Sequence, residues 1–201
     1  MARIGILGGS FNPPHLAHLV CASEAAEQLH LERVLLTPVA EPPHKDAERD
    51  PGPLERLELC RLAVAGDERL GVCDLEVRRG GSSYTVDTLR ELHAGTPEDD
   101  LTFIVGGDIA VGLPSWREPE TVLELAALAV AEREGTVHGD VGERLRASFP
   151  SGWAGRVMFF DMPRLDISSS QIRRRVAEGR SIRYLVPDPV AEHIARGRLY
   201  R

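Results

Sequence analysis

The sequence predicts an α/β protein whose mostly parallel sheet is covered by helices on both faces. Short apolar runs typical of buried strands alternate along the chain with longer segments in which apolar residues follow a helical period. Such alternation is the pattern of β-α-β units, in which consecutive strands run parallel. The length of 201 residues suits one domain of this class. We therefore expect a single domain over residues 1–201, with a small helical part at about 165–201.

The predicted strands are short apolar runs that end at glycine, proline or polar residues. They cover residues 4–7, 34–36, 70–73, 101–105, 127–131 and 157–160. Helices are predicted over residues 19–29, 84–93, 118–125, 139–149, 168–178 and 189–196, and residues 74–83 are predicted to form a polar turn. A further helix follows Pro53, with Leu54, Leu57 and Cys60 on its buried side. The loops after the first four strands should meet at one edge of the sheet, where such folds bind ligands.

Composition limits the class of partner. A net charge of −7 argues against a general nucleic-acid binder, which would carry a basic excess. The three cysteines lie far apart in no metal or redox spacing and suit a reducing cytoplasm. No apolar run approaches the ~20 residues that cross a bilayer, and residues 1–30 lack a signal-peptide pattern. We expect a cytoplasmic protein with no membrane or nucleic-acid partner; the sequence leaves its oligomeric state open, a homo-oligomer included.

The segment after the first predicted strand has the residues of an anion site. Gly8 and Gly9 end the strand and let the backbone turn tightly or approach a ligand. His15 and His18, three residues apart, lie on the same side of the helix start that follows. A strand, a glycine turn and a helix N-terminus together present N–H groups and the helix dipole to an anion, usually phosphate. As zinc ligands the two histidines lack a third partner at a recognisable spacing, so no metal bound by the protein itself is expected.

A second candidate anion site lies near the end of the chain. Residues 167–173 read I-S-S-S-Q-I-R, and Ser168 is the expected N-cap of a helix in a Ser-x-x-Gln capping box. Serine hydroxyls, free N–H groups and an arginine one turn into the helix suit a triphosphate. The simpler alternative is a helix cap with no ligand. Consecutive arginines lie about 100° apart around a helix, so Arg173, Arg174 and Arg175 cannot all point at one ligand.

Together these two motifs resemble the nucleotidyltransferase superfamily. The matching residues are Gly8-Gly9-Ser10-Phe11-Asn12-Pro13, His15-Leu16-Ala17-His18 and Ile167–Arg173. Asn12 and Ala17 depart from the superfamily pattern, in which aspartate and glycine are more familiar. The middle of the chain is similar to the bacterial nicotinate-mononucleotide adenylyltransferases at residues 38–45, 83–89, 106–108 with Trp116, and 181–187. This resemblance implies a single Rossmann-like domain.

The resemblance also implies a reaction: ATP and nicotinate mononucleotide give deamido-NAD and pyrophosphate, a step of NAD biosynthesis. The attacking phosphate is already anionic, so no general base is needed, and catalysis consists of orienting phosphates and stabilising charge. Mg²⁺ would arrive with ATP, held mainly by its phosphates. The implied catalytic residues are His18, His15 and Arg173. The implied ATP-binding residues are Gly8, Gly9, Ser10, Phe11, His15, His18, Gly106, Asp108, Arg133, Ser168, Ser169, Ser170 and Arg173. The implied mononucleotide-binding residues are Ser10, Phe11, Lys45, Tyr84, Thr85, Asp108 and Trp116.

Alternatives remain for single residues and for the whole chain. Trp116 could be a core aromatic and Asp108 a helix cap, and Lys45 and Arg133 could be exposed cations without a role. The acceptor could instead be nicotinamide mononucleotide or phosphopantetheine. A non-enzymatic alternative is a module that senses a nucleotide without turnover. Release of pyrophosphate with each acceptor separates these possibilities.

Overall fold

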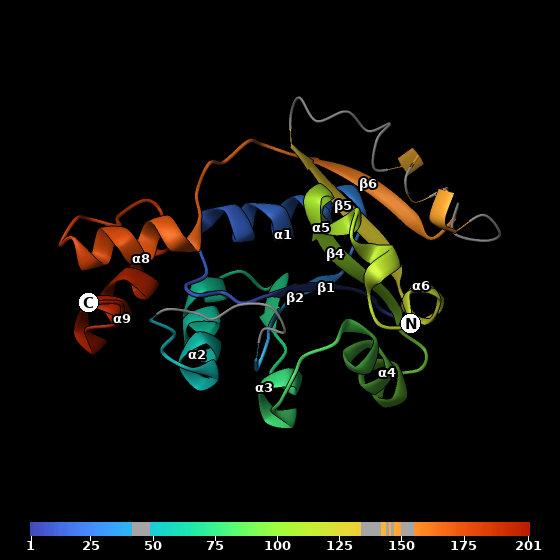
Figure 1. The fold of residues 1–201 in the computed structure, drawn as a ribbon, viewed down its shortest axis with the longest axis horizontal. Coiled ribbons are helices and arrows are strands. Elements are labelled where there is room, and N and C mark those ends of the chain that lie inside the picture. Colours follow the sequence, from blue (N-terminus) through green and yellow to red (C-terminus); the bar gives the residue numbers. More distant parts are fainter. Residues whose placement is uncertain (42–48, 134–141, 144, 146, 150–154) are drawn as a thin grey trace.

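The sheet contains six parallel strands in the order β3-β2-β1-β4-β5-β6 (Figure 1). The structure is a computed structural model that describes residues 1–41, 49–133, 142, 143, 145, 147–149 and 155–201. The chain begins in the middle of the sheet, moves outward to β3, returns to β4 and moves outward again to β6. The predicted fold class is therefore confirmed. Because the strands are parallel, their carboxyl ends all lie at one edge of the sheet.

The elements follow the predicted order closely. The strands are β1 Arg3–Gly9, β2 Arg33–Pro38, β3 Leu70–Val72, β4 Asp100–Gly106, β5 Ala127–Arg133 and β6 Val157–Met162. The helices are α1 Leu16–Gln28, α2 Pro53–Val64, α3 Leu75–Arg79, α4 Thr85–Gly95, α5 Gly107–Ala110, the 3-10 turn η1 Leu113–Ser115, α6 Pro119–Leu125, α8 Ser169–Ala177 and α9 Asp188–Gly197.

Each face of the sheet carries its own apolar layer. Successive side chains of a strand point to opposite faces, so Ile6 and Leu7 of β1 belong to different clusters. Ile6 packs on the face covered by α4 and α6, whereas Leu7 packs on the face covered by α1 and α2. The sheet is thus buried on both sides, as a parallel sheet requires.

The C-terminal helices form a small lobe on α2 (Figure 1). Ile172 of α8 and Ile194 of α9 pack with Leu59 of α2 in a third apolar cluster. His193 of α9 also hydrogen bonds Glu55 of α2. The predicted helical end of the chain is therefore seen, and α2 connects it to the sheet.

Three local features differ from the predictions. Residues 74–83 contain the short helix α3, whose five residues are too few for a helical period to show. Helix α1 begins three residues before the predicted start, because His15 rather than the first apolar run sets its N-terminus. Leu54, predicted to be buried, is 73% exposed. The predicted helix 139–149 lies partly outside the described residues. No helix within the described residues is long and apolar enough to cross a membrane.

Candidate active site

The loops after β1, β2 and β3 contact one another at the edge of the sheet. The N–H of Val39 donates to the Gly9 carbonyl at 3.0 Å, and the N–H of Ala40 donates to Ser83 Oγ at 3.0 Å. Ser83 in turn donates its N–H to the Glu41 carbonyl at 3.4 Å. The predicted convergence of these loops is therefore observed. Lys45 lies outside the described residues.

The glycines of the first loop are closely packed against aromatic rings. A Cβ at Gly8 would lie 3.2 Å from the ring of Phe103, and one at Gly9 would lie 3.1 Å from the ring of Phe11. Both distances are shorter than ordinary van der Waals contact. Phe11 has a φ of +46° and is 1% exposed, so its ring is buried beneath the turn while its backbone changes direction. A cis peptide joins Asn12 to Pro13.

The two histidines are stacked at the start of α1. Their ring centroids lie 3.7 Å apart at an interplanar angle of 25°, and the edge of Phe11 meets the His18 ring. The N–H of His15 donates to Nδ1 of His18 at 3.1 Å. Since Nδ1 accepts this bond, a neutral His18 carries its proton on Nε2. The arrangement presents His18 as a neutral N–H donor.

Burial keeps both histidines uncharged. Desolvation lowers the pKa of His15 to about 4. Desolvation, with the repulsion of His15, lowers the pKa of His18 to about 3. An anion bound beside them would oppose these shifts, since it favours the protonated form. Without a ligand, both rings are neutral donors at pH 7.

Helix α8 contacts the first loop directly. Ser168 caps the helix by accepting the N–H of Gln171 at 3.2 Å, which confirms its predicted place as N-cap. Ser169 Oγ donates to the Pro13 carbonyl at 2.8 Å, and Arg173 Nη1 donates to the Asn12 carbonyl at 2.8 Å. The two sequence motifs, far apart in the chain, are therefore in direct contact.

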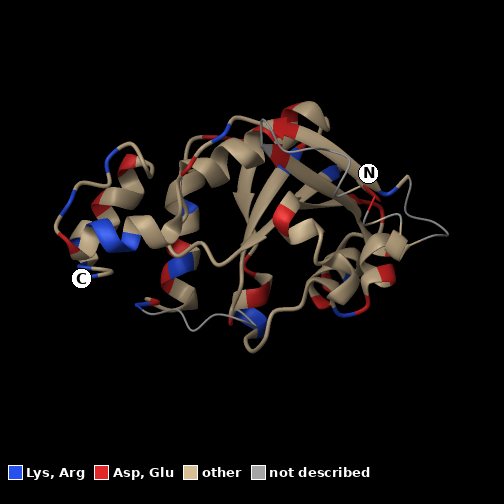
Figure 2. Cartoon of the chain, turned by 45° about the horizontal axis from the view of Figure 1, so that its top comes forward, with Lys and Arg blue, Asp and Glu red and all other residues tan. Residues whose placement is uncertain are grey.

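The N-terminus of α8 borders a polar cavity of about 390 Å³. It is lined by Leu165, Asp166, Ile167, Ser168, Gln171 and Arg174. In Figure 2 the ribbon of α8 and of the segment after it carries the colour of basic residues, in a molecule whose net charge is −7. Arg175 donates instead to the Ser181 carbonyl, which is a structural contact. This corner of the protein combines a helix N-terminus with local positive charge, both of which favour polyphosphate.

Of the residues predicted for the mononucleotide, Tyr84, Thr85 and Trp116 lie on two neighbouring segments. Tyr84 is the N-cap residue of α4 and Thr85 its first residue, and the first N–H groups of a helix have no intrahelical partner. Trp116 follows η1 and packs edge-on against Phe103 with ring centroids 5.9 Å apart. The guanidinium of Arg117 lies 5.0 Å from the centre of the Tyr84 ring and connects the two segments.

Asp108 lies over the end of β4. A Cβ at Gly106 would lie 2.8 Å from Asp108 Oδ1, so the carboxylate folds back over the end of the strand. Asp108 stands inside α5, after the N-cap residue Gly106, so the alternative of a helix cap does not hold. Arg133 is the last residue of β5 at the same edge of the sheet; its side chain is outside the described part.

Arg56 is the residue that the sequence did not reveal. It lies on α2 between Leu54 and Leu57 and is 0% exposed, whereas Leu54 faces solvent. Its guanidinium pairs with Asp50 at 3.0 Å and donates to three backbone carbonyls of the converging loops. An arginine beside two leucines carries no pattern that distinguishes it from a solvated one. Only the tertiary structure shows its place.

A buried carboxylate holds α3 against α4. Thr88 Oγ1 donates to Glu76 Oε1 at 2.7 Å, and Arg79 Nη2 donates to Thr88 Oγ1 at 3.0 Å. Burial raises the pKa of Glu76, an effect opposed by the hydroxyls of Thr88 and Ser83 and by Arg79. These contacts fix the segment that leads to Tyr84.

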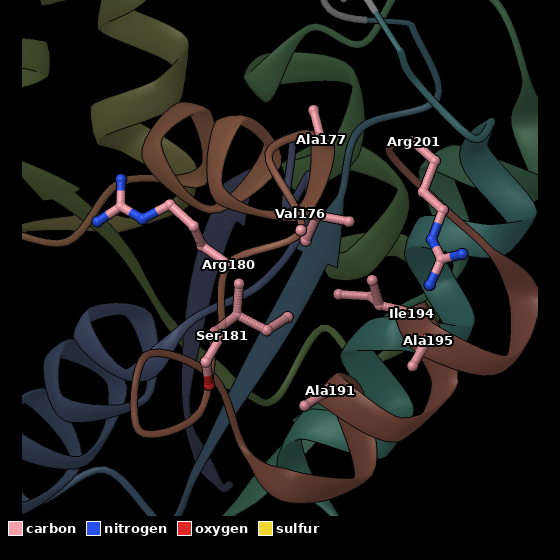
Figure 3. A pocket seen from close by; sticks show the side chains of 10 residues that line it. Val176, Ala177, Arg180, Ser181, Ala191, Ile194, Ala195 and Arg201 are labelled. Atoms are coloured by element: carbon pink, nitrogen blue, oxygen red, sulfur yellow. The ribbon is translucent and has the colours of Figure 1, made fainter.

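A larger cavity of about 520 Å³ lies in the C-terminal lobe, between α8 and α9 (Figure 3). Val176, Ile182 and Ile194 form apolar parts of its wall, and Arg180 and Arg201 lie at its rim. None of the residues predicted for substrate binding lines it. Within the described ranges, no group of three His, Cys, Asp or Glu side chains could hold a metal ion.

Comparison with known proteins identifies the family. A profile described as cytidylyltransferase-like matches residues 6–175. A relative from Citrifermentans bemidjiense, named "probable nicotinate-nucleotide adenylyltransferase", is 45% identical over 213 residues, covering 98% of this chain and 98% of its own. A relative of the same name from Desulfitobacterium hafniense is 43% identical, covering 99% of this chain and 96% of its own.

Solved structures confirm the fold. A Plasmodium falciparum nicotinic acid mononucleotide adenylyltransferase complexed with NaAD has a TM-score of 0.78 at 19% identity, covering 100% of this chain and 98% of its own. A putative nicotinate-nucleotide adenylyltransferase from Vibrio parahaemolyticus has a TM-score of 0.66 at 23% identity, covering 100% of this chain and 96% of its own. Because the profile spans most of the chain and the relatives align over nearly their full length, the chain belongs to the cytidylyltransferase-like family, among the nicotinate-nucleotide adenylyltransferases.

Proposed function

We propose that the protein transfers the adenylyl group of ATP to nicotinate mononucleotide, giving deamido-NAD and pyrophosphate in NAD biosynthesis. The observation that carries this proposal is the contact of α8 with the first loop through Ser169 and Arg173. It brings the start of α1 and the start of α8, each suited to phosphate, to one place. The relatives' shared name supports nicotinate mononucleotide as the acceptor.

The chemistry needs orientation and charge stabilisation rather than a base. An oxygen of the mononucleotide phosphate attacks the α-phosphorus of ATP, and the bond to the pyrophosphate oxygen breaks. His18 donates from Nε2, with His15 beside it, to oxygens that gain charge. Arg173 and the N-terminus of α8 at Ser168–Ser170 hold the departing pyrophosphate. ATP would enter as its magnesium complex, in which the phosphates are the main ligands of the metal ion.

The acceptor lies across the loops that follow β3 and β4. Free N–H groups at Tyr84 and Thr85 receive the nicotinate carboxylate, which gains more from such donors than a neutral amide does. Trp116 stacks on the pyridine ring and Asp108 binds ribose hydroxyls. Gly8, Gly9 and Gly106 are assigned to ATP through their backbone, since the rings of Phe103 and Phe11 and the Asp108 carboxylate already lie close to where their Cβ atoms would be. Lys45 is assigned to the mononucleotide phosphate and Arg133 to the border of the ATP site.

A pyrophosphate-release assay tests the proposal. Purified protein is given ATP and Mg²⁺ with nicotinate mononucleotide, nicotinamide mononucleotide or phosphopantetheine, and the dinucleotide is identified by mass. We expect release with nicotinate mononucleotide and a clear preference for it over the amide. Release only with another acceptor would reassign the substrate. ATP binding without release from any acceptor would favour a nucleotide-sensing module.

A further inference from the structure

Arg56 is a buried cation whose Nη atoms donate to the backbone of the converging loops and whose Nε donates to Asp50. Nη1 donates to the Ser10 carbonyl at 2.9 Å and to the Val39 carbonyl at 2.7 Å, and Nη2 donates to the Ala40 carbonyl at 2.8 Å. Nε pairs with Asp50 Oδ1 at 3.0 Å. Burying a guanidinium is costly unless its donors are paired in this way, so such a site is stable only when both loops are in place.

Each carbonyl held by Arg56 also fixes an N–H group. In a planar trans peptide the C=O and the N–H of the same unit point in opposite directions. The Ser10 carbonyl points at Arg56, so the N–H of Phe11 points away from α2, toward the other side of the phosphate loop. The Val39 carbonyl points at Arg56 as well, and the N–H of Ala40 donates to Ser83 Oγ.

These bonds form one chain of contacts between the two proposed substrate sites. Ser10 and Phe11 lie in the loop assigned to the phosphates, whereas Ala40 and Ser83 lie beside the start of α4, assigned to the nicotinate carboxylate. A displacement of the guanidinium would therefore move both sites together. The charge of Arg56 is largely offset by Asp50, so its effect is geometric more than electrostatic.

We propose that Arg56 is a positioning residue for both substrates: without touching either, it sets the distance between the phosphate loop and the loop that leads to the nicotinate pocket. The inference rests on the proposed function. The proposed role depends on the planar geometry of the guanidinium and not on its charge alone. A lysine at this position keeps the charge but cannot donate to three carbonyls in fixed directions.

The experiment compares Arg56→Lys, Arg56→Ala and wild type in steady-state kinetics with each substrate varied in turn. We expect kcat/KM to fall about 100-fold in Arg56→Lys for both substrates, since displacing reacting groups by ~1 Å costs that order of rate. Guanidinium ion at non-denaturing concentration should restore part of the activity of Arg56→Ala and none of that of Arg56→Lys. Arg61→Ala, which removes an exposed arginine of the same helix, is the matched control and should keep wild-type kinetics.

The outcomes separate the inference from the proposed function. A folded Arg56→Lys within about twofold of wild type for both substrates overturns the inference and leaves the function intact. If Arg56 variants do not fold, Asp50→Ala replaces them; it removes the acceptor of Arg56 Nε and also the acceptor of the Gly52 N–H at the start of α2, while the Nη donors of Arg56 keep their carbonyls. It should raise KM for both substrates while the protein stays folded, and unchanged KM values would refute the positioning role. An inactive wild type contradicts the function itself.

Discussion

His18 uses its two ring nitrogens for different purposes. Nδ1 accepts the N–H of His15 and stabilises the start of α1, which leaves the proton on Nε2 for a ligand. The same side chain thus contributes to the fold and, in the proposed mechanism, to the chemistry. A substitution that keeps an acceptor in place of Nδ1 but removes the Nε2 donor separates the structural role from the proposed catalytic one.

Replacing His18 tests this division. His18→Asn keeps an acceptor near the position of Nδ1 but loses Nε2, whereas His18→Ala loses both. We expect both variants to lower kcat by about 10²–10³, the usual effect of removing one donor to developing charge. His18→Ala should also lose about 1 kcal/mol of the free energy of unfolding, and His18→Asn less. Turnover near wild type in His18→Asn would show that Nε2 makes no catalytic contact.

The buried histidines also make stability depend on pH. The pKa of His15 is lowered from 6.5 to about 4 and that of His18 to about 3, so the unfolded chain binds their protons first. Their stabilising contribution is present above pH 6.5 and is lost as pH falls through the folded-state pKa values. For His15 alone the loss is roughly 3 kcal/mol by pH 4. Urea unfolding from pH 7 to pH 4 should show the free energy of unfolding falling with pH. His15→Gln should make this dependence on pH less steep.

Helix α8 is positioned at its N-terminus by contacts with the first loop. Ser169→Ala removes the hydroxyl that donates to the Pro13 carbonyl. We expect kcat/KM for ATP to fall about fivefold, corresponding to one neutral hydrogen bond of roughly 1 kcal/mol. Ser181→Ala removes a hydroxyl further along the same C-terminal segment and serves as the control. Equal kinetics in the two variants would mean that α8 needs no such contact.

Much of the architecture can be predicted from local sequence patterns, because most elements are long enough to show a pattern. Strands such as β1 and β4 have apolar runs long enough to identify, and Ser168 has a capping sequence that acts within one turn. Helix α3 has a single turn and thus no period to detect. The burial of Arg56 depends on carbonyls from residues up to 46 positions away, which no local pattern encodes.

At the scale of the whole molecule, α9 supports the site without contributing to it. Its Ile194 is 2% exposed in the cluster that joins α2, α8 and α9. Ile194→Ala should lower the free energy of unfolding by about 2–5 kcal/mol, as large-to-small changes in a core do. Glu192→Ala, on the exposed side of the same helix, should change it little. Thermal unfolding measures both, and equal stability would exclude a shared core in this lobe.

The contact between α8 and the first loop joins residues 161 positions apart in the chain. A polypeptide leaves the ribosome from its N-terminus, so the glycine turn and both histidines emerge long before Arg173 does. The contact between the two segments can form only after α8 has emerged. A nascent chain that ends before α8 therefore has only half of the proposed nucleotide site, and capture of ATP on the ribosome would report the emergence of α8.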